Sequence, residues 1–140
     1  MAHWLMKSEP ASYSWDDLVR DGGTTWDGVR NNAARLHLRA MRPGDQAFLY
    51  HSMADKAVVG IMEIVGAGEP DGPDGAWVKV PVKPVRALAK PVTLAAIKAE
   101  PRLAKMEVIR QSRLSVAPVR NEEWAQVLKM GGERAKGRKG

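Results

Sequence analysis

The sequence contains no cysteine among its 140 residues. Disulfide bonds, thiolate metal sites and cysteine nucleophiles are therefore excluded. No apolar run approaches the roughly 18 residues that a membrane-spanning helix needs, and the first ten residues lack the basic start and apolar core of a secretory signal peptide. We therefore expect a cytoplasmic protein, or one that enters the nucleus of a nucleated cell, without a membrane partner.

The sequence motifs of common enzymes are also absent. The chain has no G-x-S-x-G or H-E-x-x-H motif, and its segment GERAKGRK lacks the Gly-Lys-Ser/Thr step of a phosphate-binding loop. The three histidines, His3, His37 and His51, are too scattered to indicate a metal site by their spacing. We therefore predict a protein that binds no metal or other cofactor and catalyses no reaction.

The positive charge is unevenly distributed along the chain. The net charge is +6, and half of it falls within residues 131–140, where four cationic residues accompany one glutamate. That segment is rich in glycine and poor in apolar side chains, so we expect a disordered basic tail that buries nothing. Its charge suits a polyanion such as nucleic acid, and it would equally serve solubility. Residues 1–130 have the length of one domain.

Hydrophobic periodicity and turn residues predict an α+β fold. Strands are predicted at 3–7, 46–52, 57–66, 77–85 and 113–119, and helices at 14–21, 29–41, 93–100 and 122–130. Ser14 and Asp17 have the spacing of a capping box, and Asn121 is the predicted cap of the last helix. Pro81 and Pro84 predict that their strand lies at the edge of the sheet. The predominance of strands favours a curved or closed sheet with helices inserted early and late.

The helix predicted at 29–41 has two unlike faces at about 100° per residue. The face expected to pack on the core consists of small and aliphatic residues, Val29, Ala33, Leu36 and Ala40. The opposite face consists of polar and basic residues, Asn31, Arg35, Arg39 and Arg42. Arg35 and Arg39 are the predicted contacts to a nucleic-acid backbone, although an ordinary solvated face has the same composition.

The segment TTWDGVRN, residues 24–31, places a tryptophan in a polar turn. Tryptophan is costly to expose, so either the fold buries Trp26 or a ligand covers it. An aromatic face suits a flat heterocycle, since stacking on a base contributes about 1–3 kcal/mol, and Ser8 or Asn31 can read a ring edge. Three cations near the ends of predicted elements are able to contact phosphate groups: Lys7, Arg30 and Arg113.

Five separated segments are distinctive as a set: WLMKSEP, TTWDGVRNNAARLHLRAMRPGD, FLYHS, VVGIMEI and RLSVAPVRNEEWAQVL. Together they resemble the EVE domain family, in order and through nearly all of residues 3–130, so 1–130 is the predicted EVE domain. The resemblance implies a PUA-like fold, which is a mixed β-barrel flanked by short helices. It also implies a reader of modified bases, with 5-methylcytosine or its oxidised forms in DNA favoured and modified RNA bases left open.

The resemblance further implies which residues line a base-binding pocket. They are Lys7, Ser8, Trp26, Val29, Arg30, Asn31, Tyr50, His51, Ser52, Arg113, Leu114 and Ser115. A base flipped out of its stack would cover the indole of Trp26, which the fold is then expected to leave partly open. We expect a monomer whose partner is nucleic acid with a modified base.

Two other functions remain open at this point. ASCH-like relatives of the fold include hydrolases of modified cytidines, and Lys7, Glu9 and Thr24 or Thr25 offer nucleophilic and acid/base groups, so a hydrolase is the alternative. A protein-interaction module that uses the basic helix face would instead have no concave pocket.

Overall fold

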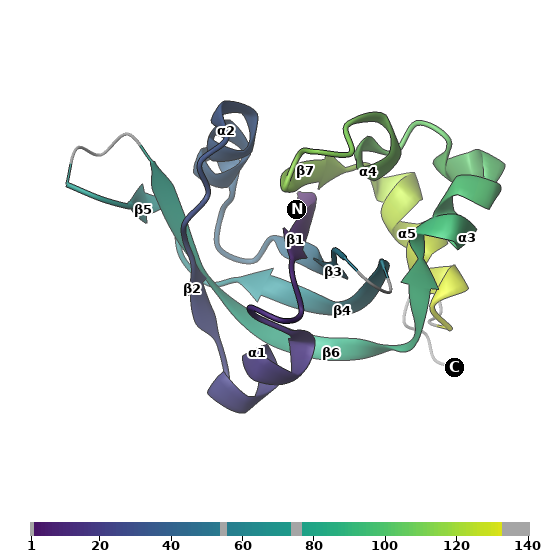
Figure 1. Cartoon of the computed structure of the whole chain (residues 1–140), viewed down its shortest axis with the longest axis horizontal. Helices are drawn as coiled ribbons and strands as arrows, with labels where there is room; N and C mark the ends of the chain where they lie inside the picture. The colour runs from purple at the N-terminus through teal and green to yellow at the C-terminus, as the bar shows by residue number, and fades with distance from the viewer. Residues whose placement is uncertain (1, 54–55, 74–76, 133–140) are drawn as a thin grey trace.

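The computed structural model describes residues 2–53, 56–73 and 77–132 (Figure 1). The strands are β1 (His3–Ser8), β2 (Thr24–Trp26), β3 (Gln46–His51), β4 (Ala57–Ile64), β5 (Glu69–Pro70), β6 (Val78–Thr93) and β7 (Val116–Val119). The helices are α1 (Trp15–Asp21), α2 (Asn32–Ala40), α3 (Leu94–Ala99), the 3-10 helix η1 (Pro101–Leu103), α4 (Glu107–Arg110) and α5 (Asn121–Met130). These elements confirm the predicted α+β class. The predicted tail lies outside the described residues from position 133 onward.

The strands form one curved mixed sheet in the order β2-β6-β4-β3-β1-β7, and β5 pairs with β6 outside that path. β1 and β3 run parallel, whereas the other paired strands are antiparallel. Figure 1 shows β6 sweeping along the sheet from its hairpin with β5 to the end where α3 and α5 lie. Because the sheet curls, strands that are distant in this order approach one another.

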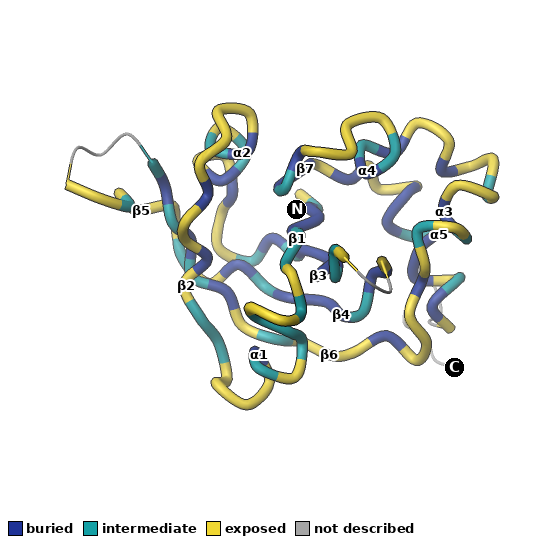
Figure 2. The backbone as a smooth tube through the Cα atoms, viewed as in Figure 1, coloured by how far each residue is buried: buried dark blue, intermediate teal, exposed yellow. Residues whose placement is uncertain are grey.

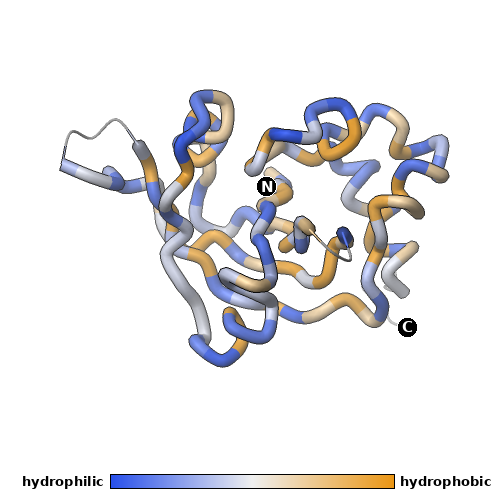
Figure 3. The backbone as a smooth tube through the Cα atoms, in the orientation of Figure 1, coloured by the Kyte–Doolittle hydropathy of each residue, from blue (hydrophilic) through white to orange (hydrophobic). Residues whose placement is uncertain are grey.

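Both faces of the central strands are covered by apolar side chains. Successive residues of a strand point to opposite faces, and accordingly Trp4 and Met6 belong to one hydrophobic cluster whereas Leu5 belongs to the other. The first cluster includes residues of α1, α2 and β2, and the second includes residues of α3, η1 and α5. Figure 2 shows β3 and β4 buried over most of their length, and Figure 3 shows that the middle of the molecule is predominantly hydrophobic. The sheet is therefore a shared wall between two cores.

Helix α1 begins and ends where its sequence signals predict. The Ser14 side chain accepts a hydrogen bond from Asp17 N at 3.1 Å, and the Asp17 carboxylate accepts one from Ser14 N at 2.9 Å. Gly22 follows the helix in the left-handed conformation, with φ of 74°, which glycine adopts without steric strain. The predicted capping box is confirmed.

Helix α2 begins later than predicted and buries a different face. Asn31 is extended and caps the helix by accepting a hydrogen bond from Ala34 N at 2.9 Å, so Val29 lies outside the helix. Ala34 and Leu38 are buried, whereas Leu36 is 57% exposed. The helix has two adjacent apolar stripes, one of Ala33, Leu36 and Ala40 and the other of Ala34 and Leu38. The prediction counted Val29 as helical and therefore favoured the first stripe, which is exposed.

Strand β6 lies inside the sheet, so its predicted edge position was wrong. β2 pairs with it on one side and β4 on the other. Pro81 lies just past the pairing with β4, whose last residue, Ile64, is opposite Val82. Pro84 lies beside a register shift of the same ladder. The two prolines, which lack an N–H donor, therefore occupy an end and an irregularity of the ladder.

The last third of the chain needs two smaller corrections. β7 begins at Val116, so residues 113–115 form a loop that leads into it. The N-cap residue of α5 is Arg120 rather than Asn121, which is the first residue of the helix. The Glu123 carboxylate accepts a hydrogen bond from Arg120 N at 3.0 Å, and this contact replaces the predicted asparagine cap.

Candidate nucleic-acid-binding site

A cavity of about 450 Å³ opens where the ends of β1 and β2 meet the loop before β7. Three strands separate β1 from β2 in the sheet order, so it is the curl of the sheet that brings them together. The volume falls within the roughly 300–1,000 Å³ typical of small-molecule sites. The predicted base-binding residues that line this base cavity are Lys7, Ser8, Trp26, Val29, Arg30 and Ser115.

The base cavity has further walls that the sequence analysis did not assign to base binding. Glu9, Thr24 and Thr25, which were predicted only for the alternative hydrolase, line it. Ser12, Tyr13, Asp27 and Gly28 line it as well and were missed altogether. The sequence signal for Tyr13 was its position as an aromatic residue five residues after Ser8 and directly before the capping box.

Trp26 is both a core residue and a wall of the base cavity. It is 9% exposed and belongs to the first hydrophobic cluster, which corrects the expectation of a partly open indole. The reason is that 24–26 is a strand and not a turn, with Trp26 opposite Val80 of β6. The indole therefore presents only a small part of its surface to the cavity.

The loop between β2 and α2 is held from outside by the hairpin of β5 and β6. The Asp71 carboxylate accepts hydrogen bonds from Gly28 N at 2.9 Å and from Arg30 Nη1 at 3.0 Å. These two contacts, in that order, lower the pKa of Asp71. The Arg30 guanidinium also lies 5.4 Å from the ring centre of Trp77. The charge of Arg30 is thus compensated within the protein.

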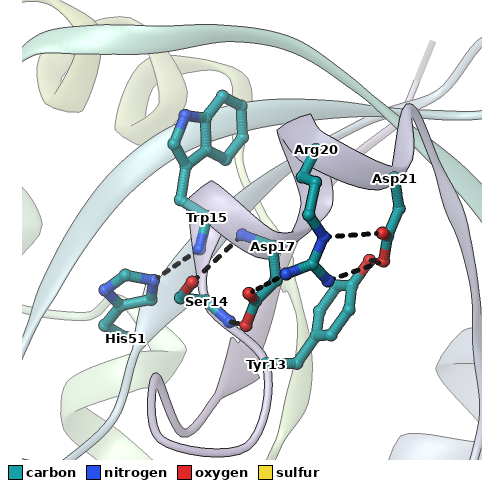
Figure 4. A network of polar contacts seen from close by, with 7 residues as sticks. All are labelled: Tyr13, Ser14, Trp15, Asp17, Arg20, Asp21 and His51. Atoms are coloured by element: carbon teal, nitrogen blue, oxygen red, sulfur yellow. Dashed lines mark hydrogen bonds and ion pairs between the residues drawn. The ribbon is translucent and has the colours of Figure 1, made fainter.

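Another wall of the base cavity is fixed by α1 and the loop before it (Figure 4). Ser8 Oγ donates to Tyr13 O at 2.6 Å, so the hydroxyl proton is committed and only lone pairs remain for a ligand. The Tyr13 hydroxyl donates to Asp21 Oδ2 at 2.8 Å, and Arg20 Nε donates to Asp21 Oδ1 at 3.0 Å. Burial, followed by the contact with Asp21, raises the pKa of Tyr13.

Three predicted base-binding residues support this wall from behind and line neither of the two cavities described here. His51 Nε2 accepts a hydrogen bond from Trp15 N at 3.0 Å, and burial lowers the pKa of its imidazole. The neutral ring must therefore carry its proton on Nδ1. Ser52 N donates to Ser8 O at 2.9 Å, and Tyr50 is 2% exposed within the second cluster.

Lys7 connects the base cavity to the loop before β7. Its Nζ donates to Ser112 O at 2.7 Å and lies 5.7 Å from the ring centre of Tyr50. Its backbone N donates to Ser115 O at 2.9 Å. Burial, followed by the charge of Lys56, lowers the pKa of Lys7. One residue thus anchors the loop at two points.

The remaining predicted base-binding residues line a second cavity of about 350 Å³. This side cavity is formed by Asn31, Ala33, Gln111, Ser112, Arg113 and Leu114. The chain neighbours Arg30–Asn31 and Leu114–Ser115 each contribute one residue to each cavity. Residues predicted for one base-binding pocket therefore line two cavities that are adjacent along the chain.

The two predicted backbone contacts lie on α2 and line neither cavity. The Arg35 guanidinium is 5.4 Å from the ring centre of Trp77, and Arg39 is exposed. Their contact with phosphate stays a prediction. Among the described residues there is no group of three or more potential metal ligands, and no helix is long and apolar enough to cross a membrane.

Comparison with known proteins identifies the family. The EVE domain profile matches residues 2–130. Thymocyte nuclear protein 1 of Homo sapiens is 33% identical over an alignment of 165 positions, gaps included, that covers 92% of this chain and 73% of that protein. The NMR structure of a Rhodopseudomonas palustris protein is 54% identical, with a TM-score of 0.91 and 94% of both chains covered.

A crystal structure of human THYN1 in complex with DNA containing 5-methylcytosine is also similar. It is 32% identical to this chain, with a TM-score of 0.87, and the match covers 96% of this chain and 99% of that chain. These structures confirm the PUA-like fold, in which a curled mixed sheet is flanked by short helices. Fold and sequence agree, and the chain belongs to the EVE domain family.

Proposed function

We propose that this protein binds DNA in which a cytosine carries a modification such as a 5-methyl group, and that it does so without catalysing a reaction. The observation that supports the proposal is the base cavity. The chain is similar to human THYN1, whose structure was solved in complex with DNA containing 5-methylcytosine. The same cavity would suit a modified base in RNA, which makes matched RNA the first competitor to test.

A base reaches such a cavity only after it leaves its stack. The walls of the cavity are side chains of strands and loops, so a duplex cannot enter, and the nucleotide must rotate out of the helix at a cost of a few kcal/mol. Trp26 and Tyr13 supply aromatic surface, and the hydroxyl groups of Ser8 and Ser115 supply polar contacts. With one base bound, modest affinity is expected.

The hydrogen bond of Ser8 gives the cavity a preference among bases. Its hydroxyl can only accept from a ligand, because its proton is used on Tyr13 O. Cytosine carries an amino group that donates, whereas thymine carries a carbonyl at the same position. Thymine has the same methyl group as 5-methylcytosine, so an acceptor at Ser8 would separate the two.

The test is a titration with oligonucleotides that differ at one position. Fluorescence anisotropy should give the tightest binding with 5-methylcytosine, followed by cytosine. Trp26→Phe keeps most of the core volume and should weaken binding, whereas Trp124→Phe, in the second cluster, should leave it unchanged. Thermal melts of both variants control for folding. Equal affinity of the wild-type protein for cytosine and 5-methylcytosine would reject the proposal.

A hydrolase is the second candidate, because Lys7, Glu9, Thr24 and Thr25 line the same cavity. Burial lowers the pKa of Lys7, which brings an amine closer to the range of a general base. The bond from Lys7 Nζ to Ser112 O explains its position without a reaction. Incubation with modified cytidines followed by mass spectrometry separates the two functions, since turnover that Lys7→Arg abolishes would replace the binding proposal.

A further inference from the structure

The two cavities differ in the charge of their walls. The base cavity is lined by two acidic residues, Glu9 and Asp27, beside Lys7 and Arg30. Arg30 is paired with Asp71, and Lys7 donates to Ser112 O. The cations of the base cavity are thus occupied or balanced, and a phosphate group would meet carboxylates there.

The side cavity has the opposite character. Arg113 is its one charged lining residue, and it is exposed. Arg113 makes no hydrogen bond or ion pair with the residues that the structure describes. Its guanidinium therefore has five N–H donors available for a ligand.

The polar neighbours of Arg113 add to this preference for an anion. Asn31 Oδ1 already accepts from Ala34 N, so its amide offers Nδ2–H donors to the side cavity. Gln111 Nε2 is bonded to Glu107 Oε1 on α4. Ser112 keeps a hydroxyl that can donate, while its carbonyl is held by Lys7. Donors thus outnumber acceptors among the groups that remain available.

The two cavities are adjacent at two places along the chain. Arg30 and Asn31 are consecutive, as are Leu114 and Ser115, and consecutive Cα atoms are about 3.8 Å apart. A nucleotide whose base lies in the base cavity would therefore place a flanking phosphate beside residues of the side cavity. The bond from Lys7 to Ser112 O fixes the loop that carries Arg113 relative to the base cavity.

We infer that the side cavity is a subsite for the backbone phosphate next to the flipped nucleotide, with Arg113 as its cation. The inference rests on the proposed function, because it places the base in the base cavity. It gives Arg113 a role different from base reading, since a phosphate group carries no information about the base. It also puts the specific phosphate contact at this loop rather than on α2.

The experiment couples one side chain to one phosphate. DNA with a single 5-methylcytosine is prepared in three forms: natural, and with the phosphate on either side of that nucleotide replaced by a neutral methylphosphonate. Each form is titrated against the wild-type protein, Arg113→Ala and Arg110→Ala. Arg110 is an exposed arginine three residues before Arg113 that pairs with Glu107 and lines neither cavity. Arg110→Ala is therefore the control for the loss of one positive charge near the site.

One of the two methylphosphonates should weaken wild-type binding about tenfold, the effect of losing one charge-assisted hydrogen bond. Arg113→Ala should weaken binding to natural DNA by a similar factor and should show no further loss with that methylphosphonate. Arg110→Ala should keep the wild-type response. The inference is overturned if neither methylphosphonate weakens wild-type binding, or if Arg113→Ala responds as strongly as the wild type.

The same titrations with cytosine in place of 5-methylcytosine keep this inference separate from the proposed function. The ratio of the two affinities reports on base reading, and the ratio between phosphate and methylphosphonate reports on the subsite. Arg113→Ala should keep the preference for the methylated base. Loss of that preference in Arg113→Ala would show that Arg113 contacts the base and would overturn the assignment, whereas its absence from the wild type would reject the proposed function itself.

Discussion

Replacing Ser8 by alanine should remove most of the discrimination between 5-methylcytosine and thymine while leaving DNA binding in place. In the folded protein the Ser8 hydroxyl donates to Tyr13 O at 2.6 Å, so it faces a ligand as an acceptor. It would accept from the 4-amino group of 5-methylcytosine and would oppose the carbonyl of thymine. Alanine can do neither.

The magnitude follows from the number of hydrogen bonds involved. One neutral hydrogen bond gained with 5-methylcytosine and one buried acceptor left unpaired with thymine together contribute about 2 kcal/mol, which is roughly a 30-fold preference. Ser8→Ala should reduce the preference to a few-fold at most. The same change leaves Tyr13 O without its donor, so the free energy of unfolding should fall by about 1 kcal/mol.

The assay is anisotropy with single-stranded oligonucleotides, in which no opposite base distinguishes the two ligands. Ser52→Ala is the matched control, because Ser52 contacts Ser8 through its backbone N and lines neither cavity. Denaturant melts confirm that each variant is folded at the assay temperature. The assignment of Ser8 would be refuted by a folded Ser8→Ala variant that still prefers 5-methylcytosine over thymine by about 30-fold, which corresponds to roughly 2 kcal/mol.

Asp45→Ala should lower the free energy of unfolding by about 2–3 kcal/mol in urea melts. The buried carboxylate of Asp45 accepts hydrogen bonds from Trp4 Nε1 and from Arg42 N, each at 3.0 Å. A loss below about 1 kcal/mol, the contribution of one hydrogen bond, would contradict this. Stability should also fall as the pH falls below about 6.5. Burial lowers the pKa of all three histidines, so the unfolded chain takes up protons first and the contribution of the neutral histidines to stability is lost as the pH falls. A constant Tm through that range would be contrary evidence. Deleting residues 133–140, which carry a net charge of +3, should leave Tm unchanged and flatten the salt dependence of DNA binding, whereas a lower Tm would show that they contribute to folding.

Features signalled by a few neighbouring residues were predicted in part, and the burial of Trp26, which distant pairing fixes, was missed. The cap of α5, although local, was assigned to Asn121 instead of Arg120. The cap of α1 depends on Ser14 and Asp17, which are three residues apart. The burial of Trp26 depends on the pairing of β2 with β6, and no residue near Trp26 signals that partner. Reading 24–26 as a turn followed from its polar neighbours, whereas the antiparallel pairing turns the indole inward.

The candidate site shows the same division. The resemblance to a family predicted twelve residues of a base-binding pocket, and six of them line the base cavity. It could not predict that Asn31 caps α2 with its amide oxygen and so faces the side cavity. Nor could it predict Asp71, whose carboxylate binds Gly28 N and Arg30 across a hairpin far along the chain.

The sheet that separates the two hydrophobic clusters has a consequence for evolution and design. Both cavities are built from loops and strand ends around the first cluster, while the stacked rings of Phe48 and Trp124, 3.8 Å apart, consolidate the second. Substitutions at the exposed positions of the loops 27–31 and 111–115 can thus change the lining of both cavities without disturbing that second core. A library randomised only at those positions would test whether the proposed base recognition can be redirected to other modified bases, with the rest of the chain kept as a scaffold.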